Sequence, residues 1–161
     1  MTDMPTREQL LLLAVAVAAQ ARAHGNHPFG ALLADSTGTV LLTAENTVVT
    51  GRDVTGHAET NLVRLASAAY PAAELNALTL FTSTEPCAMC SGAIFWSGIG
   101  SVVYALAESG LYELTGDDPE NLTLRLPCRD VFAAGRRPIL VEGPFDLPEA
   151  REVHAGFWRP S

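Results

Sequence analysis

Residues 78–98 read LTLFTSTEPCAMCSGAIFWSG, and this stretch decides the type of fold. Leu78–Thr84 is rich in apolar and hydroxyl side chains, which is typical of a strand. A helix is expected over Pro86–Ser97, because proline suits a first helical turn, and Gly98 should end it. A short buried strand follows at Ser101–Ala105. Strand and helix therefore alternate in this part of the chain.

The same alternation extends in both directions from this stretch. Thr6 and Gln9 form a capping-box pattern, so a first helix should run from about Thr6 to Ala23. Residues 29–35 and 39–47 should pair as a β-hairpin around a turn at 36–38. Further along the chain we expect a helix from about 57 to 70, a mostly irregular segment at 107–127, a short helix at 129–134, a strand at 138–142 and a terminal helix at 148–158. This order predicts a mixed sheet covered by helices on both faces.

The bulk composition is that of an ordinary globular protein. The 161 residues suit a single domain spanning 1–161, and 48% of them are apolar. Ten basic and 18 acidic residues give a formal charge of −8. A negative chain is poorly suited to gripping a polyanion, so the composition argues against a nucleic-acid partner.

The three cysteines, Cys87, Cys90 and Cys128, do not form a disulfide framework, because their number is odd and only two are close in sequence. A reduced, cytoplasmic setting is the simplest expectation. Leu10–Ala19 is an apolar run, but ten residues are too few to span a bilayer. A signal peptide also needs a positively charged leader, whereas acidic residues precede this run. We therefore expect a largely buried helix and no membrane partner.

Two short motifs carry the chemistry of the chain: HAE at 57–59 and PCAMC at 86–90. Each is expected where a strand leads into a helix, with the two helix starts side by side on adjacent parallel strands. Cys87 and Cys90 are three residues apart and share a helix face. With His57 they offer one imidazole and two thiolates, a donor set that suits zinc with a fourth position left for water. A closed structural site would need a fourth protein ligand, and His24, His27 and His154 show no paired spacing.

Glu59 completes this arrangement. A carboxylate two residues from a metal ligand can lie beside the water without binding the metal. It can then move protons between the water, a substrate ring and a leaving amine. A non-enzymatic zinc scaffold, the alternative class, would have no use for this carboxylate.

The H-x-E and P-C-x-x-C motifs together resemble the cytidine and deoxycytidylate deaminase superfamily. More narrowly, the chain is similar to the branch that holds bacterial guanine deaminases and tRNA adenosine deaminases. The similarity spans roughly residues 5–106. The matching motifs are HPFGA at 27–31, Asn46, HAE at 57–59 and TSTEPCAMCSGAI at 82–94. Segments 109–127 and 155–159 depart from the guanine deaminase pattern, and both are expected to touch substrate.

This resemblance implies an α/β fold, a three-layer α/β/α sandwich with a mixed five-stranded sheet, in a protein that is usually dimeric. It also implies roles for individual residues: His57, Cys87 and Cys90 as ligands of one zinc ion per chain, Glu59 as the proton shuttle, and Asn46 and the Ala58 main-chain N–H as contacts to the substrate ring.

Two aromatic residues, Phe29 and Trp96, are candidates for stacking on a flat ring, with core packing as the alternative for each. Asn46 could equally cap a turn at the end of the hairpin. The helix at 86–97 is apolar all round, which together with the resemblance predicts a homodimer.

The sequence favours deamination of a free purine base, with guanine first. The segment after the last buried strand is acidic, and a carboxylate there would accept hydrogen bonds from guanine's second amine and ring N–H. Glu113 is the first candidate for that carboxylate. The alternatives are a deaminase of cytosine or of a free nucleoside, and a tRNA adenosine deaminase, which the charge of −8 disfavours.

Overall fold

A computed structural model describes residues 3–161, and its centre is a five-stranded sheet in the order β2-β1-β3-β4-β5. Strand β1 is antiparallel to both of its neighbours, whereas β3, β4 and β5 are parallel to one another. The strands are β1 (Gly30–Ala34), β2 (Val40–Glu45), β3 (Thr79–Thr84), β4 (Ser101–Leu106) and β5 (Leu140–Glu142). The predicted mixed five-stranded sheet is confirmed.

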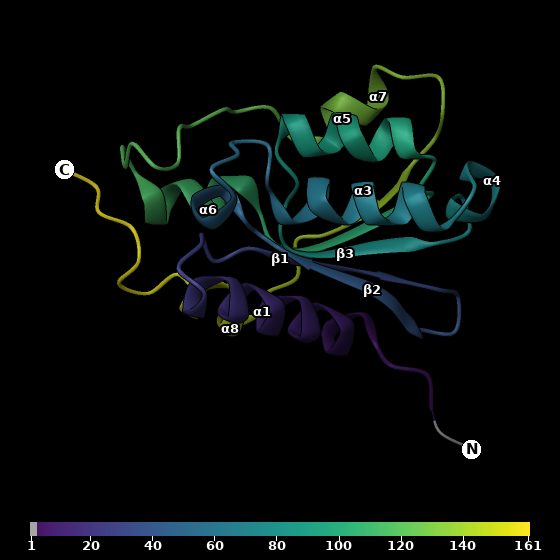
Figure 1. The fold of residues 1–161 in the computed structure, drawn as a ribbon, viewed down its shortest axis with the longest axis horizontal. Coiled ribbons are helices and arrows are strands. Elements are labelled where there is room, and N and C mark those ends of the chain that lie inside the picture. Colours follow the sequence, from purple (N-terminus) through teal and green to yellow (C-terminus); the bar gives the residue numbers. More distant parts are fainter. Residues whose placement is uncertain (1–2) are drawn as a thin grey trace.

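Helices cover both faces of this sheet, which gives the predicted three layers. Figure 1 shows α3, α5 and α7 on one face and α1 and α8 on the other. The helices are α1 (Arg7–Ala23), α2 (Val48–Gly51), α3 (Ala58–Ala69), α4 (Ala72–Leu75), α5 (Ala88–Ser97), α6 (Glu108–Thr115), α7 (Cys128–Ala133) and α8 (Pro148–Glu152). None of the helices in residues 3–161 has the length and apolar character that crossing a membrane requires.

The alternation of side chains along the strands divides the core into two layers. Leu33 and Leu80 are fully buried with the α3 and α5 side chains, and their strand neighbours Leu32 and Phe81 pack on the α1 side. Both faces of the central strands are therefore apolar, as a sheet between two helical layers requires. This double packing holds the strand ends, from which the functional side chains extend, in fixed positions.

The sequence also predicts the first helix correctly at its N-terminus. The Thr6 hydroxyl accepts a hydrogen bond from the Gln9 main-chain N–H at 3.1 Å, and the Gln9 carboxamide accepts from the Thr6 N–H at 2.8 Å. This reciprocal pair satisfies two groups that the helix itself cannot pair.

The structure refines three local expectations. The segment at 107–127 contains helix α6, but its other residues, 107 and 116–127, are irregular, so most of the segment is irregular as expected. The terminal helix ends at Glu152, well before residue 158, and Gly156 then adopts a positive φ of 69°. The helices α2 and α4, four residues each, were not expected, because such short elements have no periodicity to detect.

The expected placement of the two motifs is also corrected. Strands β2 and β3 are not adjacent, because β1 lies between them. The HAE motif does not follow a strand directly either, since α2 and a turn separate it from β2. The starts of α3 and α5 come together because the two helices pack side by side on one face of the sheet. Pro86 precedes the N-cap residue Cys87 and lies outside the first helical turn.

Candidate active site

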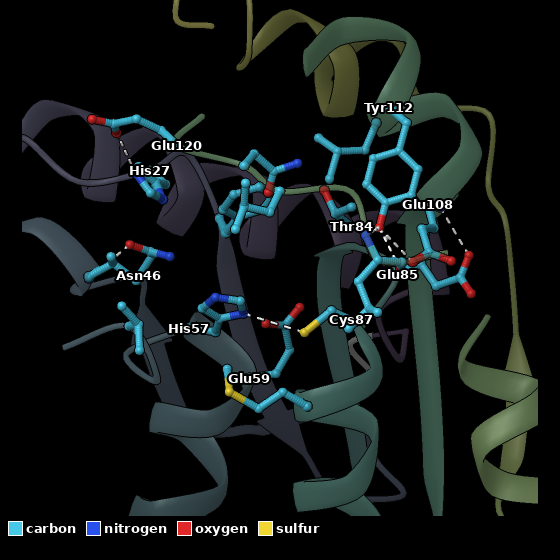
Figure 2. A pocket seen from close by; sticks show the side chains of 18 of the residues that line it. His27, Asn46, His57, Glu59, Thr84, Glu85, Cys87, Glu108, Tyr112 and Glu120 are labelled. Carbon is cyan, nitrogen blue, oxygen red and sulfur yellow. Dashed lines mark hydrogen bonds and ion pairs between the residues drawn. The ribbon is translucent and has the colours of Figure 1, made fainter. Parts of the chain in front are cut away.

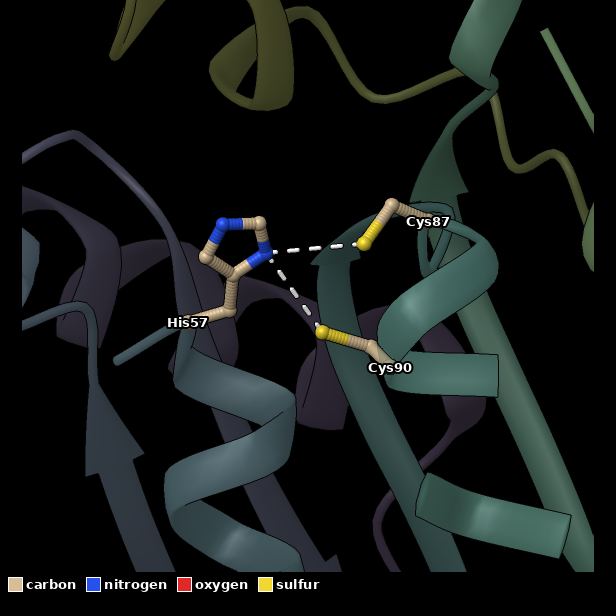
Figure 3. Close-up of side chains that lie close together, drawn as sticks. All are labelled: His57, Cys87 and Cys90. Carbon is tan, nitrogen blue, oxygen red and sulfur yellow. Dashed lines mark hydrogen bonds between the residues drawn. The ribbon is translucent and has the colours of Figure 1, made fainter. Parts of the chain in front are cut away.

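Three potential metal ligands converge at the starts of α3 and α5. His57 is the N-cap residue of α3, Cys87 is the N-cap residue of α5, and Cys90 lies one turn along α5. The His57 Nδ1 atom is 3.5 Å from each of the two sulfur atoms (Figure 3). Among residues 3–161, these form the one group of three or more possible ligands whose donor atoms lie within 4.8 Å of one another.

The geometry of this group fits a zinc ion. Zn–N and Zn–S bonds of about 2.05 and 2.3 Å at a tetrahedral angle place nitrogen and sulfur about 3.6 Å apart. The observed separations of 3.5 Å agree with that value. Hydrogen bonding from the Cys90 thiol, together with the nearby His57, lowers the pKa of Cys87 to about 4, which favours the thiolate form that binds a metal ion.

Other histidines in the described chain do not approach this group. His24 bonds to Glu45, His27 to Glu120, and His154 accepts from the Trp158 indole N–H at 3.0 Å. The three-ligand set therefore has the open form that is typical of catalytic zinc sites.

Glu59 lies beside the ligands, in the first turn of α3. It is 5% exposed, and burial raises the pKa of its carboxyl group. The Thr82 hydroxyl donates a hydrogen bond of 2.7 Å to one carboxylate oxygen and so fixes its orientation. A buried carboxyl group with a raised pKa, held in one orientation next to a metal site, is suited to proton transfer.

A cavity of about 420 Å³ opens over these residues. Figure 2 shows His27 and Asn46 on one side of it and Thr84, Glu108 and Tyr112 on the other, with His57 and Glu59 between them. Asn46 is buried, and its side-chain oxygen accepts the Val48 N–H at 3.0 Å, which leaves the NH₂ group as its remaining polar end. The turn-capping role and the cavity position thus belong to the same side chain.

Phe29 lies in the wall of the cavity, and Ala58 lies beside it. Phe29 lines the cavity and packs edge-on against His154, with ring centroids 5.3 Å apart. Ala58 is fully buried as the first residue of α3, between two residues that line the cavity. Its main-chain N–H is one of the first-turn groups that a helix does not pair internally.

Two other predicted substrate contacts lie outside the cavity. Trp96 is 84% exposed, and it lies six residues beyond Cys90, about 240° around α5, so the two side chains cannot share a face. Glu113 forms an ion pair with Arg151 at 2.6 Å on the surface. It lies about 140° around α6 from Glu108, which is the acidic residue of α6 that does line the cavity.

Sequence reasoning missed the carboxylate that organises the wall of the cavity. Glu85 accepts a hydrogen bond from the Glu108 N–H at 3.0 Å and another from the Cys128 N–H at 2.9 Å. One side chain therefore anchors the first residues of α6 and α7 next to the metal ligands. The sequence signal for this role is the glutamate of the TSTEPC motif at 82–87, which directly precedes Pro86 and the first cysteine ligand.

The cavity is acidic. Its lining includes the carboxylates of Glu59, Glu85, Glu108 and Glu120 and, within the described residues, no lysine or arginine. Two further acidic residues hold the C-terminal tail, because Asp118 accepts the Arg159 N–H at 2.6 Å and Asp117 accepts the Ser161 N–H at 2.7 Å.

Comparisons with known proteins agree with this site. The model of the cytidine and deoxycytidylate deaminase zinc-binding region matches residues 4–106. A probable cytosine deaminase from Schizosaccharomyces pombe is 46% identical over 145 residues, 90% of this chain and 88% of the relative. The solved guanine deaminase from Nitrosomonas europaea is 27% identical, with a TM-score of 0.73 over 96% of this chain and 87% of that one. A further solved structure, a complex with 8-azaguanine, is 28% identical, with a TM-score of 0.75 over 94% of this chain and 86% of that one.

The matched region contains the whole constellation of His57, Glu59 and the two cysteines, and the match covers more than half of the chain. The chain therefore belongs to the zinc-binding cytidine and deoxycytidylate deaminase family and is a hydrolytic deaminase acting on C–N bonds.

Proposed function

We propose that this deaminase acts on a free nucleobase, with cytosine as its first substrate and guanine as its second. The sequence alone favoured guanine. The observation that reverses the order is the position of the acidic residues that were expected to accept guanine's extra N–H donors. Glu113 pairs with Arg151 outside the cavity, and Asp117 and Asp118 bind the tail.

Two acidic residues of the segment at 107–127 do line the cavity, and both already have partners. The Tyr112 hydroxyl donates a hydrogen bond of 2.7 Å to Glu108, and the His27 Nε2 atom lies 2.8 Å from Glu120. Guanine would therefore have to share or displace an internal partner, whereas cytosine has no second amine to satisfy. The similarity to a probable cytosine deaminase over 90% of the chain supports the same order. The cavity of about 420 Å³ and the 8-azaguanine complex of a related protein keep guanine as the second candidate.

The acidity of the cavity supports a substrate without phosphate. Four carboxylates line it without a compensating lysine or arginine among the described residues. A phosphate brought into this field would be repelled by it, and a neutral base would not. Nucleotides and tRNA are therefore poorer candidates than free bases or nucleosides.

His57, Cys87 and Cys90 would hold a zinc ion, which would lower the pKa of a water molecule toward about 7 and make it a nucleophile. Glu59 would take one proton from this water and pass it to the ring nitrogen as the oxygen bonds to the amine-bearing carbon. It would then take the second proton from that oxygen and pass it to the amine, which leaves as ammonia while the carbon keeps the oxygen as a carbonyl group. The Asn46 NH₂ group donates to a polar atom of the ring, and Phe29 forms an apolar wall beside it.

Ammonia release tests this proposal. Initial rates should be compared at equal concentration for cytosine, cytidine, guanine, guanosine, adenine, dCMP and a tRNA anticodon stem-loop. We expect cytosine to be turned over fastest, guanine more slowly, and dCMP and the stem-loop hardly at all. A preference for dCMP or RNA would contradict the free-base assignment, and a preference for guanine would restore the order that the sequence favoured.

We also propose that the chain is a homodimer in which α5 lies at the interface. Trp96 is 84% exposed and Met89, on the same helix, is 37% exposed. A second copy packed against α5 would cover these exposed apolar side chains.

Sedimentation at micromolar concentration should therefore give a dimer, and Trp96→Asp should shift it to a monomer. Leu13→Asp, at a half-exposed leucine of α1 on the opposite layer, is the matched control and should leave the dimer intact. A wild-type monomer would exclude the dimer, and dissociation by Leu13→Asp alone would move the interface to α1.

A further inference from the structure

Cys90 is the most deeply buried of the three metal ligands. His57 and Cys87 are half-buried, whereas Cys90 is fully buried in the first turn of α5. A thiolate in such a position has little water around it, so its charge has to be met by the metal ion and by hydrogen-bond donors of the protein. Within residues 3–161, the hydrogen-bond partners of its sulfur are His57 and Cys87, which belong to the ligand group, and Thr60, which does not.

Thr60 lies in the first turn of α3, directly after Glu59. Its hydroxyl oxygen is 3.2 Å from the Cys90 sulfur, and within residues 3–161 it forms no other hydrogen bond. Either atom could donate while the cysteine is a thiol, but a cysteine that binds a metal ion is a thiolate and can only accept. In the metal-bound protein the Thr60 hydroxyl is therefore the donor, and the sulfur accepts a hydrogen bond from the neighbouring helix.

A hydrogen bond to a ligand sulfur has two physical consequences. It stabilises the buried thiolate, and so favours the form that binds the ion over the protonated thiol. It also draws negative charge away from the sulfur, which then passes less charge to the metal ion. The ion remains more electron-poor, and a water molecule bound to such an ion loses its proton more readily.

We propose that Thr60 is a positioning residue of the metal centre, whose hydroxyl donates a hydrogen bond to the Cys90 thiolate and strengthens zinc binding through it. The inference rests on the ligand group and not on the identity of the substrate. The start of α3 then supplies three different groups: a ligand from His57, a proton carrier from Glu59, and from Thr60 a hydrogen-bond donor to the ligand on α5.

The first test is the zinc affinity of two variants at this position, measured by competition with a chromophoric zinc chelator. Thr60→Val removes the hydroxyl and keeps the shape of the side chain, whereas Thr60→Ser keeps the hydroxyl. We expect Thr60→Val to bind zinc about tenfold more weakly than the wild type, because outer partners of metal ligands commonly contribute at least that much. Thr60→Ser should stay close to the wild type.

Cobalt(II) loaded in place of zinc gives a second readout that does not depend on activity. Its sulfur-to-metal charge-transfer absorption band reports how readily the ligand sulfurs release an electron. A sulfur that has lost its hydrogen bond is more electron-rich, so Thr60→Val should move this band to lower energy. Thr60→Ser should leave the band in place.

Thr115→Val is the matched control, because Thr115 is a buried threonine of α6 outside the ligand group, and this variant should leave both readouts unchanged. Thr60→Ala is a second variant without the hydroxyl, and its small side chain cannot crowd the start of α3. Unchanged zinc affinity in Thr60→Val and Thr60→Ala would overturn the proposal. Equal losses in Thr60→Val and Thr60→Ser, or in Thr115→Val, would also overturn it. Weaker zinc binding with an unmoved cobalt band would assign the effect to packing and not to the sulfur, which would overturn it as well.

Discussion

Glu59→Gln should keep zinc and fold and lose at least about 100-fold in kcat, the usual contribution of a general acid–base group. Glutamine has the same shape and its carbonyl oxygen can still accept the hydrogen bond from Thr82, so the geometry is preserved. It cannot carry a proton between water, ring and amine. Because burial raises the pKa of the Glu59 carboxyl group, a buried charge is unfavourable there, and the neutral variant should be at least as stable as the wild type.

Three measurements on the same sample check this expectation: zinc per chain, Tm, and the rate of ammonia release. Glu113→Gln is the control, since it removes an equivalent charge from an ion pair on the surface. Activity within a few-fold of wild type in Glu59→Gln would assign the proton transfer to another group. Loss of zinc in this variant would instead place Glu59 among the metal ligands.

Cys87→Ala should abolish both zinc binding and activity. The three ligands come from two helix starts, and the remaining His57 and Cys90 would leave zinc with only two protein donors. Removal of the metal should also lower the Tm, since a ligand that binds only the folded state stabilises it. Metal analysis by mass spectrometry, together with ammonia release, checks both effects.

Cys128→Ala is the matched control for this experiment. Cys128 is a buried cysteine at the start of α7 and is not part of the ligand group, whereas Cys87 is half-buried. It should retain one zinc ion per chain. Equal zinc loss in the two variants would mean that Cys87 acts through general stability and not as a ligand.

The metal ligands and the sheet could be predicted because their signals are local. The capping pair of Thr6 and Gln9, and the apolar strands that flank the motifs, depend on neighbours in the sequence. The ligand set could be predicted for the same reason, since two cysteines three residues apart share a helix face.

The wall of the cavity could not be predicted, because its contacts join distant parts of the chain. Helix α6 begins at a residue whose N–H binds Glu85, 23 positions earlier in the sequence. The position of Trp96 away from the cavity could not be predicted for a related reason. Its aromatic character suggested a stacking role, but only the rotation of α5 relative to the ligands decides which way the side chain points.

The double hydrogen bond at Glu85 joins the N-terminal ends of α6 and α7, because one carboxylate accepts the N–H groups of residues 108 and 128. It therefore closes a path that comprises α6 and the segment at 116–127. That segment contributes Pro119, Asn121 and Leu124 to the cavity and none of the metal ligands. Natural variation, or a graft from another deaminase, can therefore alter which ring is accepted without disturbing the metal ligands or the sheet.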